Sequence, residues 1–276
     1  MVGFIDVRVR SFVALLATLS CLLMAVACDR QPGVADSVTA PAHSPATRLL
    51  RAAAGNDPVE TRRLLDAGFD ADQPGPGGRT ALMVAAEHGR ADTLALLLRA
   101  GAAIDLGDSG GMTALMLAAR HGHGDAVRRL IEAGADVAIR SRTGTSALLE
   151  AVRGGDLPAV DALLVAGADP AQQCERGLGV LHVVRGRAES LLDRLLGLGL
   201  DVDQADSEGL TPVMRAARLG DVALLARLHG AGADLDRRDV LGRDALQHAR
   251  LAKQRQAVDW LTARRSDPIH QSVTRP

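Results

Sequence analysis

Aromatic side chains are almost missing from this chain of 276 residues, which contains no Tyr, three Phe and one Trp. Phe4 and Phe12 lie in the N-terminal segment, so Phe69 and Trp260 are the only aromatic residues beyond it. A core without aromatic rings must be filled by Leu, Val and Ala. Such a core favours thin layers of short helices over a β-sandwich or a barrel.

Cysteine and lysine are also scarce, with three Cys in the chain and Lys253 as the single lysine among 32 basic residues. Cys21 and Cys28 belong to the N-terminal segment, which leaves Cys174 as the sole thiol of the remaining chain. A disulfide framework is therefore excluded, and we expect Cys174 to be an ordinary turn residue, with an intermolecular or redox role as the alternative. The net charge of −1 provides no global field that would attract nucleic acid or an anionic membrane.

The first 27 residues have the layout of an export signal. Arg8 and Arg10 supply positive charge, the run 11–27 carries none, and the letters A-V-A before residue 28 are typical of a cleavage site. Cys28 follows directly. This order resembles a bacterial lipoprotein signal peptide, which is cut before a cysteine that becomes acylated. The resemblance implies lipidation of Cys28, although Ala25 stands where that family prefers Leu.

Three modes of attachment are compatible with the segment 1–27. It is the signal of a lipoprotein anchored at Cys28, a signal peptide whose removal releases a soluble periplasmic protein, or an uncleaved anchor. The third mode stays open because about 17 apolar residues, at about 1.5 Å each, nearly cross a ~30 Å hydrocarbon core. In each mode the Arg-bearing end stays inside, so we predict that the rest of the chain lies on the periplasmic side of a bacterial membrane.

Two segments without an apolar period flank the centre of the chain. Residues 28–46 are rich in Pro, Ala and Ser, and we expect a flexible linker after the lipidation site. Residues 266–276 are expected to form a disordered tail. The folded domain is therefore predicted to span residues 47–265.

A short motif recurs through this domain at a nearly constant interval. It reads G-R-T-A-L-M-V-A-A-E-H-G from Gly78 and G-M-T-A-L-M-L-A-A-R-H-G from Gly111. Its first glycines are spaced by 33, 33, 33, 32 and 33 residues at positions 78, 111, 144, 177, 209 and 242. A second landmark, L-L-R-A-G-A or a variant of it, follows each motif, and one further unit with an altered beginning precedes them. Self-similarity at this period indicates seven stacked units of helical repeat.

These residues resemble the ankyrin repeat, whose signature T-P-L-H-x-A-A-x-x-G is matched most fully at Thr211, Pro212, Val213, Ala216, Ala217 and Gly220. Only His182 keeps the family's histidine. The resemblance covers about residues 47–265. It implies an all-α solenoid of about seven helix-turn-helix repeats joined by β-turn fingers.

Local physical chemistry supports the same fold. Thr80, Thr113 and Thr211 are predicted to cap the first helix of their repeats, and glycines such as Gly134 to end the second helix. The repeat that begins at Gly177 is predicted to be a weak joint. There Arg185 stands near a position that is normally small and packed, and one residue is missing before Leu195.

Ankyrin proteins commonly bind partners through the finger tips and the concave face made by the first helices, so the resemblance implies a partner-binding surface there. The candidate residues on the helices are Glu87, His88, Arg120, His121, Arg153, Arg187 and Arg218, and those on the fingers are Arg142, Arg176, Arg237 and Arg238. Three of the arginines occupy equivalent positions, which suits a carboxylate-rich protein or an anionic polymer. The alternative is a solvated row, because arginine is nearly the only cation this chain uses.

Catalytic and metal-binding patterns are not apparent in the repeats. No Ser-His-Asp order, glycine-rich phosphate loop or HExxH helix occurs. His121 and His123 with Asp125 lack a fourth metal ligand, and the periodic acidic residues are explained by the family's G-A-D-V sequence, so no metal and no cofactor is predicted.

The leading prediction is a non-enzymatic scaffold for protein–protein interaction in the bacterial cell envelope. Its partner is a periplasmic or envelope protein, an acidic one if the arginine row is functional; no nucleic acid and no small-molecule substrate is expected. Two alternatives stay open, a structural or spacer lipoprotein without a dedicated partner and a secreted effector.

Overall fold

The computed structural model describes residues 45–185 and 189–265, and within them the regular structure is almost entirely α-helical. Fourteen helices, α2 to α15, form seven pairs, and one short 3₁₀ helix, η1, spans Pro76–Gly78. In the described residues strand pairing is limited to two isolated bridges, Gly107–Thr113 and Arg140–Ser146. The predicted all-α stack of seven helix pairs is confirmed.

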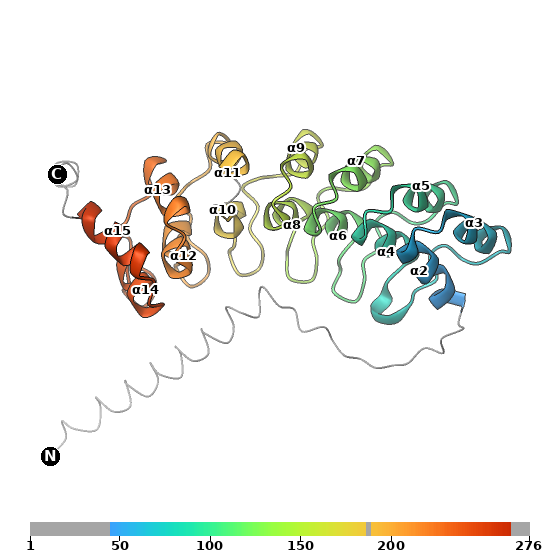
Figure 1. Cartoon of the computed structure of the whole chain (residues 1–276), viewed down its shortest axis with the longest axis horizontal. Helices are drawn as coiled ribbons and strands as arrows, with labels where there is room; N and C mark the ends of the chain where they lie inside the picture. The colour runs from blue at the N-terminus through green and yellow to red at the C-terminus, as the bar shows by residue number, and fades with distance from the viewer. Residues whose placement is uncertain (1–44, 186–188, 266–276) are drawn as a thin grey trace, which may run out of the picture. The chain divides into compact units, whose positions relative to one another are not determined.

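The helices form two layers (Figure 1). We call the first helix of each pair the inner helix; these are α2 Pro45–Gly55, α4 Ala81–Glu87, α6 Ala114–Arg120, α8 Ala147–Gly154, α10 Val180–Val183, α12 Pro212–Leu219 and α14 Ala245–Leu251. The outer helices are α3 Pro58–Asp66, α5 Ala91–Arg99, α7 Gly124–Glu132, α9 Leu157–Val165, α11 Glu189–Leu196, α13 Val222–Gly230 and α15 Arg255–Arg265. Each inner helix packs on its own outer helix and on the inner helices of the neighbouring repeats.

Side-chain caps start most of the inner helices. The hydroxyls of Thr80, Thr113 and Ser146 each accept a hydrogen bond from the backbone N–H three residues on, which satisfies one unpaired donor of the first turn. The prediction that the Thr211 side chain caps its helix is wrong. Thr211 occupies the cap position, but its hydroxyl is buried and has no partner among the described residues; Pro212, with its fixed φ, begins the helix instead.

Glycine is required where the chain turns sharply or where helices approach closely. Gly134 follows α7 with a φ of 93°, a left-handed conformation that costs a glycine little. At Gly154 an added Cβ would lie 2.7 Å from the carbonyl oxygen of Ala119, so α8 can approach α6 only with glycine there.

The core between the layers is aliphatic, as the lack of aromatics predicts. Leu82, Leu115 and Leu148 are 1% exposed, and they recur at the same position of successive inner helices. Alanines such as Ala85 and Ala118 are completely buried and allow the inner helices to pack closely. Each helix pair covers the apolar face of the neighbouring pair, so a single repeat does not have a complete hydrophobic core.

Loops between each outer helix and the next inner helix form the fingers, and backbone hydrogen bonds join their tips. The donor–acceptor pairs are Ser109 to Gly77 (2.8 Å), Arg142 to Gly110 (2.9 Å), Glu175 to Thr143 (3.1 Å), Ser207 to Arg176 (3.0 Å) and Val240 to Glu208 (3.2 Å). The equivalent donor position in the first finger is Pro76, which has no N–H. The fingers are therefore linked in one continuous row.

The repeat that begins at Gly177 has a shortened inner helix. α10 has four residues, whereas the other inner helices have seven or more. Val184 is extended at φ −62° and ψ 146°, which ends the helix, and its side chain is buried. The expectation that Arg185 intrudes on a packed position is wrong: because α10 has already ended, Arg185 is exposed.

The structure describes the predicted folded domain from its first helix, α2, onward. α2 begins at Pro45, two residues before the predicted start at 47, because proline is well suited to the first turn of a helix. The signal peptide 1–27 with Cys28, the linker up to residue 44 and the tail 266–276 lie outside the described residues. Within the described residues, no helix has the length and apolar character needed to span a membrane.

Candidate partner-binding surface

A cluster of histidines surrounds Glu87 at the end of α4. His121 Nε2 lies 3.6 Å and His88 Nδ1 lies 3.8 Å from the Glu87 carboxylate, and Arg79 forms an ion pair with it. The Nε2 of His123 lies 2.9 Å from the Glu87 carbonyl oxygen. Burial lowers the pKa of His121, against the opposing attraction of Glu87. The structure therefore brings together three of the predicted surface residues, Glu87, His88 and His121.

Glu150 holds two of the predicted arginines. Its side chain is 1% exposed, and it lies in the first turn of α8. Arg120 donates from Nε to Oε2 at 2.8 Å and from Nη2 to Oε1 at 3.2 Å. Arg153 donates from Nη1 to the same Oε1 at 2.9 Å. Two guanidinium groups from adjacent inner helices therefore converge on one buried carboxylate, with a net charge of +1.

This arrangement corrects the expectation of a row of uncompensated guanidinium groups. Arg120 and Arg153 are only 29% and 20% exposed, because both side chains fold onto Glu150. Arg218 is half-buried on α12, and Arg187 lies outside the described residues. Of the predicted helix arginines, Arg120 and Arg153 therefore share one carboxylate, whereas Arg218 lies on a different inner helix.

The finger candidates lie at separate positions along the row. Arg142 is exposed at its finger tip, and Arg176 lies 3.5 Å from Glu208 of the next finger. Arg237 and Arg238 are also exposed, and each donates one hydrogen bond to a backbone carbonyl oxygen, of Asp203 at 2.7 Å and of Gly242 at 2.9 Å. The finger arginines thus present charge to solvent more openly than those on the helices.

Aspartates that are buried or half-buried shape the finger turns, and they were not among the predicted site residues. Asp108, Asp206 and Asp239 occupy equivalent positions, and one carboxylate oxygen of each accepts the backbone N–H groups two and four residues on. Ser141 takes the same position with its hydroxyl, and Cys174 does so with a thiol. The recurrence of Asp at the same position of three repeats, 108, 206 and 239, was a usable signal.

The last finger is also tied to its own inner helix. His248 Nε2 donates to the Asp239 carboxylate at 2.9 Å, and Arg243 Nε donates to it at 3.0 Å. Burial would raise the pKa of Asp239, but the hydrogen bonds from Arg243 lower it below the usual range. Burial lowers the pKa of His248 despite the neighbouring carboxylate. At neutral pH the finger is therefore stabilised by an ionised Asp239 carboxylate that is hydrogen-bonded to a neutral His248 ring.

The periodic acidic residues have a structural role. Asp72, Asp105 and Asp203 each accept the backbone N–H of the residue 31 positions on, in the next repeat. Asp136 and Asp169 each accept the N–H two residues on. In the described part of the chain, no group of three or more His, Cys, Asp or Glu side chains is placed to hold a metal ion.

His182, the one retained signature histidine, joins two repeats. Its Nδ1 accepts the N–H of Gly179 at 3.1 Å, and its Nε2 lies 3.1 Å from the carbonyl oxygen of Leu210 in the next repeat. Burial and the charge of Arg215 lower its pKa to about 4. The neutral ring is thus the form that both hydrogen bonds require.

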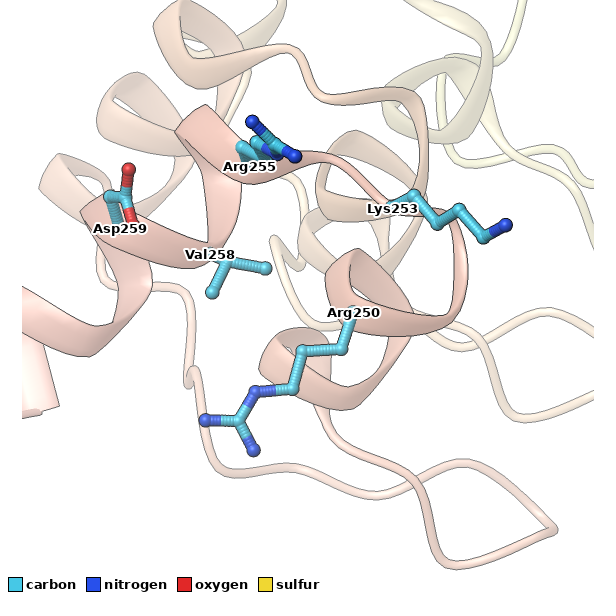
Figure 2. A pocket seen from close by; sticks show the side chains of 5 residues that line it. All are labelled: Arg250, Lys253, Arg255, Val258 and Asp259. Carbon is cyan, nitrogen blue, oxygen red and sulfur yellow. The ribbon is translucent and has the colours of Figure 1, made fainter.

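A shallow hollow of about 390 Å³ lies between α14 and α15, lined by Arg250, Lys253, Arg255, Val258 and Asp259. The three basic side chains point in different directions (Figure 2). Because their charged ends do not converge, this hollow is not a composite anion site.

Helix pairs stacked in a row with hydrogen-bonded fingers define the class of a helical repeat protein. The ankyrin-repeat model, "Ankyrin repeats (3 copies)", matches residues 49–141 and 96–174. The solved structure of the human ASB11 ankyrin repeat domain is similar, with 26% sequence identity and a TM-score of 0.71, covering 80% of this chain and 98% of that one. Among curated proteins, no sequence relative was found. The described residues therefore form an all-α ankyrin-repeat stack.

Proposed function

We propose that this chain is a non-enzymatic scaffold that binds a protein partner on the periplasmic side of a bacterial envelope, to which it is anchored through Cys28. The observation that carries the binding role is the row of linked fingers with exposed arginines, beside the inner-helix surface that holds Arg120 and Arg153. The location rests on the sequence of residues 1–28 alone.

Affinity purification of the tagged full-length protein from detergent-solubilised envelope tests the binding role. We expect a stoichiometric protein to co-purify. A variant with Arg142→Glu, Arg237→Glu and Arg238→Glu should recover it at least about fivefold less, because these exposed side chains reverse charge at the fingers without entering the core.

The matched control carries Arg62→Glu, Arg99→Glu and Arg129→Glu, three exposed arginines of the outer helices. Its charge change is identical, so it should recover the partner as the native protein does. A high copy number with no stoichiometric partner would support a spacer protein instead and contradict the scaffold.

Metabolic labelling with palmitate tests the anchor. The native chain should incorporate label and fractionate with membranes, whereas Cys28→Ser should incorporate no label. If the native chain is unlabelled, keeps its full mass and stays in the membrane fraction, the segment 1–27 is an uncleaved anchor. If the native chain is unlabelled, shortened and soluble, the protein is free in the periplasm.

A further inference from the structure

We infer that Arg120 and Arg153 form a preorganised subsite for a side-chain carboxylate of an acidic segment of the partner, with Glu150 as the positioning residue. This inference rests on the proposed binding role and specifies the part of the surface that carries it. Both guanidinium groups donate to Oε1 of Glu150, at 3.2 and 2.9 Å, so one buried atom fixes the distance between them.

Most N–H donors of the two arginines are not used by Glu150. A guanidinium carries five N–H groups, and the bonds to Glu150 use two of Arg120 and one of Arg153. Within the described chain, neither side chain makes a hydrogen bond to any other group. The Arg120 side chain is 29% exposed and the Arg153 side chain is 20% exposed. The partner would therefore meet planar donors whose conformational freedom is already lost.

Charge favours an anion at this position. Two guanidinium groups against one carboxylate leave a net charge of +1, so the pair of arginines attracts an incoming anion more strongly than Glu150 repels it. The neighbouring Glu87 is neutralised by Arg79, and His121 lies between Glu87 and Arg120 in the same electrostatic cluster.

The surface beside the arginines is also open. Gly155 lies two residues after Arg153, and a Cβ built there would meet no described atom within 4 Å outside the adjoining residues. A peptide backbone can approach closely there. A carboxylate on a flexible segment therefore fits this subsite better than a rigid, bulky group.

Hexaglutamate is a suitable probe, with hexaglutamine as its uncharged counterpart. In ¹H–¹⁵N spectra of the full-length protein, hexaglutamate should shift the Nε–Hε signals of Arg120 and the side-chain signals of Arg153 more than those of Arg99. By fluorescence anisotropy, Arg120→Lys/Arg153→Lys should bind labelled hexaglutamate at least about tenfold more weakly, because lysine keeps the charge and the pairing with Glu150 but loses the planar fork. Arg99→Lys/Arg129→Lys should stay within about twofold of the native protein.

Equal shifts at all exposed arginines, or equal binding by both double variants, would overturn the subsite. The spectra of the native protein decide the question even if the double variant is poorly folded. Recovery of a partner from the envelope by Arg120→Lys/Arg153→Lys at the native level would also refute the subsite while the scaffold role stands. Conversely, hexaglutamate binding at the two arginines with no partner recovered would refute the scaffold role alone.

Discussion

At the scale of single residues, His182 makes the stability of this protein depend on pH. Its folded-state pKa of about 4 lies below the ordinary value of 6.5, so protonation favours the unfolded chain. Its contribution is complete above pH 6.5 and is lost as the pH falls toward 4, by on the order of 3 kcal/mol in total.

His182→Gln should remove this dependence. Gln247 already accepts the N–H of Asp244 at the equivalent position, so glutamine fits the site without titrating. Between pH 7 and 4.5, the free energy of unfolding should fall less in the variant than in the native protein, as measured by denaturant titration. Parallel pH profiles would show that another group, such as His248, is responsible.

The finger turn at Cys174 lacks a side-chain oxygen to accept backbone N–H groups, which Asp or Ser provides at the equivalent position of other fingers. The thiol makes no hydrogen bond to the described residues, whereas the Ser141 hydroxyl accepts the N–H of Thr145 at 3.1 Å. Cys174→Ser should therefore raise the free energy of unfolding by about 0.5–1 kcal/mol, because a hydroxyl is the better acceptor for Leu178 N–H. Thermal unfolding measures this, and Cys174→Ala, which adds no acceptor, should bring no gain.

Sequence reasoning reached the position of most of these residues but not their partners. The signature predicted where Arg120 and Arg153 lie, because the repeat period fixes helix positions. It did not predict that Glu150, 30 residues after Arg120, lies within hydrogen-bonding distance of both arginines. Contacts between repeats depend on side-chain direction, which the period alone does not contain.

At the scale of the helices, the ion pairs between α6 and α8 should be strongly coupled. Arg120→Leu/Arg153→Leu should cost about 3–5 kcal/mol, because it leaves the Glu150 carboxylate buried and unpaired. Adding Glu150→Leu should recover most of this loss, since Leu117 and Val84 occupy the equivalent position in the two preceding repeats. Denaturant unfolding of the native protein and of both variants tests the coupling, and a triple variant no more stable than the double would contradict it.

At the scale of the whole stack, we expect the repeat with α10 to be the least stable. A repeat protein is stabilised by nearest-neighbour contacts, so a shortened inner helix reduces the coupling between the repeats on its two sides. The sequence predicted lower stability at this joint from Arg185 and from the residue missing before Leu195. Because Arg185 is exposed, the expected loss of stability rests on the early end of α10 instead.

Trp260 allows the two sides of the joint to be observed separately. It is the only tryptophan of the chain, it is half-buried in α15, and its ring meets that of His229 edge-on at 5.8 Å. We expect its fluorescence to change at a lower denaturant concentration than the far-UV circular dichroism. The reason is that α12 to α15 form the smaller block of helices, and this block packs on its N-terminal side against the short helix α10. Native-state hydrogen exchange should show the lowest protection of the inner helices at α10.

A chimaera in which residues 113–120 replace residues 179–186 is the decisive comparison. The inserted sequence forms the complete helix α6 in its own repeat, so it should lengthen α10 and restore contact with both neighbours. The fluorescence and circular dichroism midpoints should then converge, because unfolding becomes cooperative across the joint. Coincident midpoints in the native protein, with uniform exchange protection across all seven repeats, would mean that four residues of helix suffice to couple the stack.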